Sequence, residues 1–161
     1  MKKLKLKTYL KLNSVFLILI IGLFFSNCAQ SNGSDDKDLI QIFHHERPPS
    51  METLEVVNEF LEAYADKYEI KYYMIKDDKN NELLKSLGLP EDHFPFAIAI
   101  NGKTSAEING ETIIFVNLPD FMHHIGRREG NWSLDYLKTV LENKDLLLTD
   151  NPTITTEALK H

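Results

Sequence analysis

Two Asn-Gly pairs, at residues 101–102 and 109–110, divide the middle of the chain into short apolar segments. Asn-Gly accepts the left-handed backbone of a two-residue turn, so between alternating apolar residues it is a strong hairpin signal. The segments cover residues 96–100, 104–108 and 111–116. The pattern predicts an antiparallel meander, in which each strand pairs with the next one along the chain.

Strand and helix signals alternate before this meander. Residues 39–43 and 70–75 are runs rich in β-branched or aromatic residues, which favour strands, and the first run suits a buried one. Between them Ser50 is a candidate helix N-cap, and the apolar residues after it keep helical spacing: Leu54, Val57, Leu61 and Tyr64. A short helix over 81–87 should end at Gly88. We therefore expect an α/β fold whose mixed parallel and antiparallel sheet is flanked by helices.

The region after the meander offers weaker signals. Pro119 precedes a segment, 120–125, that is compatible with a short helix. A last helix should follow Asn131 or Ser133 as its cap, with one apolar face made of Leu134, Leu137, Val140 and Leu141. Residues 146–161 lack apolar periodicity and are expected to form a loose tail.

The N-terminus has the profile of an export signal. Five lysines within the first 11 positions precede an apolar run over 15–25, and no acidic residue occurs before Asp35. The run is too short for a bilayer-spanning helix, which needs about 20 residues. Its end, from Leu23 to Cys28, resembles a bacterial lipobox, although Asn27 departs from the preferred Gly or Ala. Ordinary secretion and an uncleaved anchor are the alternatives to lipoprotein processing.

Lipoprotein processing would define the layout of the chain. Residues 1–27 would be the signal peptide, 28–37 a flexible polar tether, and 38–145 the folded domain. The acylated Cys28 would hold the protein to membrane lipid, outside the cytoplasm. Cleavage removes five lysines and no acid, so the formal charge changes from −6 to −11. Such an acidic domain is a poor partner for nucleic acid.

The cysteine count limits the chemistry. Cys28 is the only cysteine in the sequence. An acylated thioether has no thiol, so the mature protein would form no disulfide and would offer no thiolate nucleophile.

Two motifs resemble the thioredoxin-like superfamily. In that family the first strand ends in an aromatic residue, and a Cys-Pro-Pro-Cys type segment opens the long helix four residues later. The stretch from Phe43 to Met51 matches this pattern in register, with Arg47 and Ser50 at the two cysteine positions and Pro48-Pro49 between them. The second motif, residues 77–103, is similar to the family's acidic turn, short helix, cis-proline, strand and hairpin.

The resemblance carries specific structural implications. Pro95 stands where the family has its cis-proline, which implies a cis bond between Phe94 and Pro95. Phe96 replaces the usual Thr, one extra residue precedes Pro95, and residues from about 111 to 130 would be an insertion that ordinary thioredoxins lack. A cis turn would expose the backbone of Phe94 as a strand edge for an extended peptide.

The function implied is that of a redox-inactive binding module rather than an enzyme. Arg47 can neither attack a disulfide nor resolve one, and Ser50 lacks an acid-oriented histidine that would activate it. No cofactor is expected, and the partner would be an unidentified protein or peptide of the cell envelope. The proposed binding face comprises His44, His45, Glu46, Arg47, Pro48, Pro49, Ser50, Phe94 and Pro95.

A metal-binding or metal-delivery protein is the alternative function. Imidazole and carboxylate groups suit Zn²⁺ or Cu²⁺, and the candidate ligands are His44, His45, Glu46 and His93. Adjacent residues rarely bind one ion together, and Arg47 would place a positive charge beside it. His123-His124 is a weaker second candidate.

Aromatic residues near Pro95 and in the insertion allow two interpretations. They are Phe94, Phe96, Phe115, Phe121 and Trp132. They could line a peptide groove, but packing in the core is the favoured interpretation for most of them.

Overall fold

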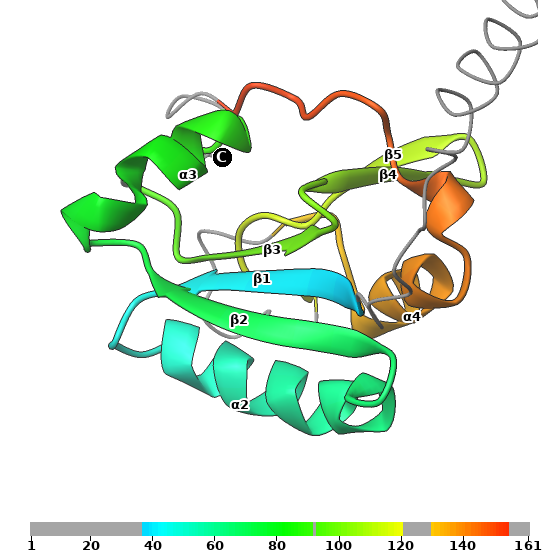
Figure 1. Ribbon diagram of the computed structural model, residues 1–161, viewed down its shortest axis with the longest axis horizontal. Helices are drawn as coiled ribbons and strands as arrows, with labels where there is room; N and C mark the ends of the chain where they lie inside the picture. Colours follow the sequence, from blue (N-terminus) through cyan, green and yellow to red (C-terminus); the bar gives the residue numbers. More distant parts are fainter. Residues whose placement is uncertain (1–36, 92, 121–129, 155–161) are drawn as a thin grey trace, which may run out of the picture. The chain divides into compact units, whose positions relative to one another are not determined.

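The computed structural model describes residues 37–91, 93–120 and 130–154. Its helices and strands, shown in Figure 1, are β1 (Asp38–His44), α2 (Ser50–Leu61), β2 (Tyr68–Met74), α3 (Asn81–Ser86), β3 (Phe96–Ile100), β4 (Ser105–Ile108), β5 (Glu111–Ile114) and α4 (Leu134–Glu142). None of the described helices is long and apolar enough to cross a bilayer. The predicted signal peptide and nearly all of the predicted tether, residues 1–36, lie outside the described residues.

The main sheet has the strand order β2-β1-β3. β1 runs parallel to β2 and antiparallel to β3, and Ile40 pairs with Ile70 on one side and with Ile100 on the other. A helix links the parallel strands, as such a connection requires. The predicted α/β fold with a mixed sheet and flanking helices is therefore confirmed.

The meander prediction is confirmed for the antiparallel pairing of β4 with β5 and wrong for the pairing of β3 with β4. β4 and β5 form a separate two-stranded sheet, and only Lys103 bridges to β3 from the β4 side. Residues 115–117 lie beside β3 instead: the Ile98 N–H donates to the Phe115 carbonyl at 2.9 Å. Where β4 leaves β3, the Thr104 N–H donates to the side-chain oxygen of Asn151 at 3.0 Å. Part of the predicted insertion thus completes the β3 edge of the main sheet.

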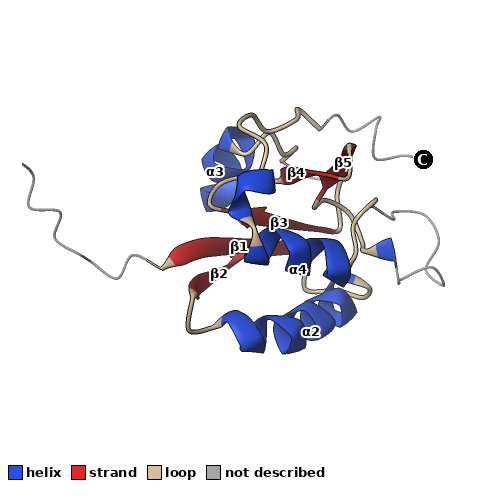
Figure 2. Ribbon diagram, turned by 90° about the vertical axis from the view of Figure 1, so that its right-hand side faces the viewer, coloured by secondary structure: helices blue, strands red, loops and turns tan. Residues whose placement is uncertain are grey.

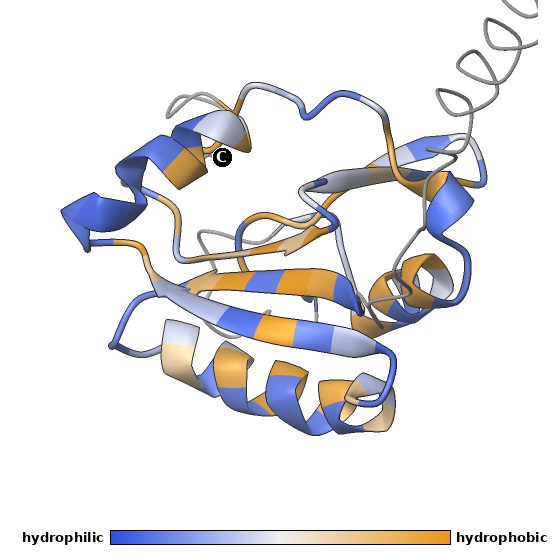
Figure 3. Ribbon diagram, in the orientation of Figure 1, coloured by the Kyte–Doolittle hydropathy of each residue, from blue (hydrophilic) through white to orange (hydrophobic). Residues whose placement is uncertain are grey.

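Helices cover both faces of the main sheet (Figure 2). The apolar stripe of α2 faces the sheet, as the hydropathy colouring in Figure 3 shows. α2 and α4 share one core with alternate β1 residues, such as Ile40 and Ile42. Phe43 points to the opposite face, where α3 closes a second core. Among the described residues, both cores draw on residues between 40 and 154.

The aromatic residues around β3 pack in the core. Phe94, Phe96, Phe115 and Trp132 are all fully buried. Phe96 stacks on Trp132 with ring centroids 6.2 Å apart. The core interpretation is confirmed for these residues, whereas Phe121 lies outside the described residues.

Residues 146–154 form a strap that is bonded to the domain, contrary to this part of the predicted loose tail, whereas residues 155–161 lie outside the described residues. The Leu148 N–H donates to the Ser105 carbonyl at 3.0 Å, and the Ile154 N–H donates to the Gly88 carbonyl at 3.0 Å. Between them the side chain of Asn151 donates to the Gly102 carbonyl at 2.9 Å. Backbone and amide groups make these contacts, so no apolar periodicity marks the strap in the sequence.

The cap of α4 is one of the two predicted. The Ser133 hydroxyl accepts a hydrogen bond from the Tyr136 N–H at 3.3 Å. The other candidate, Asn131, bonds instead to the backbone of β5, where it accepts from the Ile114 N–H and donates to the Thr112 carbonyl. The short helix predicted over 120–125 falls almost entirely outside the described residues.

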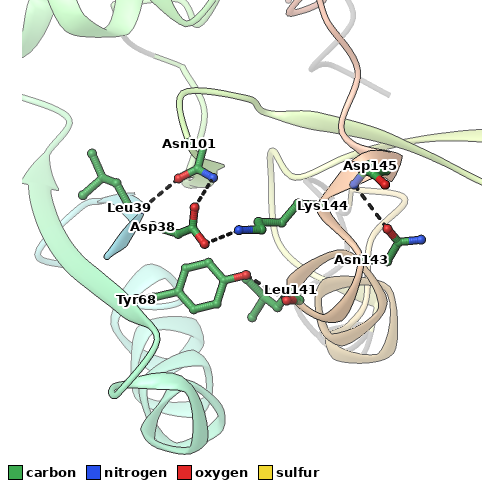
Figure 4. Close-up of polar contacts among 8 residues, drawn as sticks. All are labelled: Asp38, Leu39, Tyr68, Asn101, Leu141, Asn143, Lys144 and Asp145. Carbon is green, nitrogen blue, oxygen red and sulfur yellow. Dashed lines mark hydrogen bonds and ion pairs between the residues drawn. The ribbon is translucent and has the colours of Figure 1, made fainter. Parts of the chain in front are cut away.

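A polar clamp holds the start of β1 (Figure 4). The Asp38 carboxylate forms an ion pair with Lys144, which follows α4. Asn101 donates to the same carboxylate at 2.9 Å and accepts from the Leu39 N–H at 2.8 Å. The Lys144 hydrogen bond, together with that from Asn101, lowers the pKa of Asp38. The same bond raises the pKa of Lys144, and burial raises that of Tyr68.

Candidate functional site

The Ser50 hydroxyl joins the loop after β1 to the entrance of β3. It donates to the Pro95 carbonyl at 2.7 Å and accepts from the His45 N–H at 2.9 Å. The predicted N-cap role is wrong, because Pro49 occupies the cap position and no side chain caps α2. Ser50 is only 1% exposed, and its hydroxyl proton is donated to a backbone carbonyl. The hydroxyl is therefore not placed to act as a nucleophile.

His45 makes a second link between the same two segments. Its Nε2 lies 3.1 Å from the Phe94 carbonyl oxygen, in buried surroundings. Together with the Ser50 bonds, this contact holds the loop over residues 45–50 against residues 94–95. The predicted proximity of Ser50 and Pro95 is confirmed.

The predicted cis bond between Phe94 and Pro95 is wrong. Among the described residues the cis peptide bond lies between Pro48 and Pro49. The backbone enters β3 through His93, whose φ of 83° is in the left-handed region. His45 already contacts the Phe94 carbonyl oxygen, which is the acceptor that the expected pairing with a peptide would use.

A shallow pocket opens beside the loop where β1 and β2 end. Parallel strands place their carboxyl ends at the same edge of a sheet, and α2 begins at that edge (Figure 1). His44 pairs with Met74 in register, and its carbonyl accepts from the Ile75 N–H at 3.0 Å. The pocket measures about 180 Å³ and is lined by His44, His45, Glu46, Arg47, Met74 and Lys76.

Met74 and Lys76 were not predicted as site residues. The sequence does carry a signal for them, since the predicted strands 39–43 and 70–75 are joined by a predicted helix, a connection typical of parallel strands. The residues that end two neighbouring parallel strands meet in space.

The charged side chains of the pocket are exposed. They are Arg47 and Lys76, which are positive, and Glu46, which is negative. In the part of the chain that the structure describes, the ion pairs involve other cations, namely Lys71, Lys138 and Lys144. Arg47 and Lys76 thus present their charge to the pocket without a carboxylate partner among the described residues.

His44 forms part of the pocket wall and is 9% exposed. Its Nδ1 is buried and has no hydrogen-bond partner within the described residues. A buried polar atom left unpaired lowers the free energy of unfolding by about 1–3 kcal/mol. The unpaired Nδ1 of His44 therefore destabilises the fold locally, beside the pocket.

The four metal candidates are not assembled into a site. Across residues 37–91, 93–120 and 130–154, no group of three His, Cys, Asp or Glu side chains is placed to hold a metal ion. His45 directs its Nε2 to a backbone carbonyl, and the exposed His93 does not line the pocket. The second candidate pair, His123-His124, lies outside the described residues.

Comparison of the chain with protein-family models, with curated proteins and with solved structures gives no significant match.

Proposed function

We propose that this chain is a lipoprotein of the bacterial cell envelope whose domain is thioredoxin-like, redox-inactive and used to bind a protein or peptide. The proposal combines the lipobox-like end of the N-terminal segment with the absence of any cysteine beyond Cys28. The element order β1, α2, β2, α3 and β3, with α2 beginning at the loop after β1, agrees with the order along the chain that the resemblance implies.

The observation that carries the proposal is the double hydrogen bond of Ser50. A thioredoxin would have a reactive sulfur at this position, whereas here the hydroxyl is committed to the Pro95 carbonyl and the His45 N–H. Those bonds hold the loop in one conformation. A loop ordered in this way suits binding, because little conformational entropy is lost when a partner docks.

The proposed binding face uses side chains rather than a strand edge. Phe94 and Pro95 are buried and position the loop from beneath. Glu46, Arg47, Pro48 and Met51 are exposed around the pocket and the first turn of α2. The partner would therefore contact these exposed residues, and peptide pairing with Phe94 is not part of the proposal.

Site-specific photocrosslinking in intact cells tests the function. Benzoyl-phenylalanine is placed at Met51, which is 42% exposed beside the loop, or at Tyr72, which is 49% exposed in β2. We expect illumination to give a discrete membrane-associated adduct from the Met51 position and none from the Tyr72 position. Equal adducts at both positions, or none at Met51, Glu46 and Arg47, would contradict a binding face at this loop.

A further inference from the structure

The pocket beside Arg47 has the size of a chemical group rather than of a whole small molecule. Sites for cofactors and drug-sized ligands usually measure about 300–1,000 Å³. This pocket measures about 180 Å³. Its occupant is therefore one end of a longer ligand that continues over the surface.

The charges of the pocket select an anionic end group. Arg47 and Lys76 line it without a carboxylate partner among the described residues, and Asp77 next to Lys76 uses its side chain to accept from the Lys79 N–H. Guanidinium groups bind planar carboxylates through two parallel hydrogen bonds, which gives direction as well as charge.

The remaining charges favour a monoanion. Glu46 also lines the pocket, so Arg47, Lys76 and Glu46 leave one net positive charge. The domain is otherwise acidic, and a phosphate with nearly two negative charges would meet more repulsion than a carboxylate.

The pocket also has an apolar wall. Met74 lines it at the end of β2, and its flexible thioether adapts to apolar groups of different shape. A carboxylate between Arg47 and Lys76 would place the side chain attached to it near Met74. The ligand that combines these features is a peptide C-terminus with an apolar last residue.

We infer that the pocket captures the C-terminal carboxylate of a partner polypeptide, through Arg47 and Lys76, with the last side chain against Met74. This inference rests on the proposed function, since it names the part of the protein or peptide that the binding face holds.

Methionine-methyl NMR on the full chain in detergent micelles tests the inference. The probe is acetyl-Ala-Ala-Leu with a free carboxylate, and the matched ligand is the same peptide with a C-terminal amide. We expect the free acid to shift the Met74 methyl signal saturably, and the amide to bind about tenfold more weakly or worse, because it lacks the charge-assisted bonds.

Variants of the pocket give a second readout. Arg47→Gln and Lys76→Gln should each weaken binding of the free-acid peptide about tenfold. Glu46→Gln should strengthen this binding, because it removes a negative charge that repels the carboxylate. Lys85→Gln, an exposed lysine of α3, is the matched control and should leave the affinity unchanged.

Three results would overturn the inference: equal binding of acid and amide, no effect of Arg47→Gln, or preferential binding of inorganic phosphate. A Met51 crosslink that persists in cells with Arg47→Gln would show that the partner binds without a carboxylate contact. In that case the binding function stands and the inference alone fails. If the chain with native Arg47 gives no Met51 crosslink either, the proposed binding function itself is contradicted.

Discussion

The Ser50 hydroxyl donates to the Pro95 carbonyl oxygen at 2.7 Å and so joins the first turn of α2 to the residue before β3. Ser50→Ala should lower the free energy of unfolding by about 2–3 kcal/mol, since both the Pro95 carbonyl and the His45 N–H lose a buried partner. Urea denaturation measures the change. Ser86→Ala removes an exposed hydroxyl bond to Leu83 and should cost less than about 0.5 kcal/mol. Equal effects of the two substitutions would contradict a structural role for the Ser50 bridge.

Arg47→Cys with Ser50→Cys should create a dithiol at the start of α2. The helix N-terminus favours the thiolate of the first cysteine, so we expect an internal disulfide and reduction of insulin at least about tenfold above the unaltered chain. The experiment uses a Cys28→Ser background, and Ser50→Cys alone is the control. A folded double variant that forms no internal disulfide would show that the proposed alignment with thioredoxins is wrong.

Cys28→Ser should release the protein from the membrane fraction or stall its processing. The acylated thioether would carry the lipid, and the 11-residue apolar run of residues 15–25 is short for a permanent anchor. Fractionation and mass measurement of the N-terminus separate the two outcomes. A processed variant that stays on the membrane would exclude lipid attachment at this cysteine.

Asp38→Asn should lower the free energy of unfolding by roughly 0.2–1 kcal/mol near neutral pH, the usual range for partly exposed ion pairs. The Lys144 hydrogen bond holds the pKa of Asp38 below its ordinary value, so the unfolded chain takes up the proton at a higher pH than the folded one. The stabilisation is therefore present above the ordinary pKa and is lost as pH falls through the lowered one.

Urea denaturation of both proteins across the acid range tests this sign. The difference between the native chain and Asp38→Asn should shrink with acidification, while exposed Asp66→Asn should differ little from native at any pH. A difference that stays constant down to the acid limit would mean that the Lys144 pair does not contribute through the Asp38 charge.

Gly88→Ala and Gly110→Ala separate backbone strain from a steric clash. Both glycines have positive φ, so alanine costs roughly 1–2 kcal/mol at either position. A Cβ at Gly88 would lie 2.7 Å from the Pro152 carbonyl oxygen, whereas one at Gly110 meets nothing within 4 Å. Gly88→Ala should therefore be about 1–3 kcal/mol more destabilising, as overpacked sites are. Equal losses would argue against close packing of the strap on α3.

The local elements were predictable because their signals are local. Strand β3 matched its predicted range, and the buried face of α2 consists of residues at helical spacing, such as Leu54 and Val57. Asn101-Gly102 does mark a turn, since both residues have positive φ. A turn signal does not reveal which strand finally pairs with β3, and residues 115–117 took that place through bonds to Ile98 and Phe96.

The site was predictable in part. The loop from His44 to Ser50 and its contact with Pro95 followed from the resemblance, whereas the chemistry of that contact did not. Ser50 bonds to residues distant in sequence, and no local pattern distinguishes such a hydroxyl from a helix cap. The turn at His93 and the amide contacts of Asn151 likewise depend on tertiary context.

The strap of residues 146–154 determines when the second core can be completed during synthesis of the chain. Ile154 belongs to the second core and bonds to Gly88, so that core lacks a member until residue 154 has left the ribosome. About 70 residues that follow α3 in the sequence must therefore be synthesised before α3 gains this packing partner.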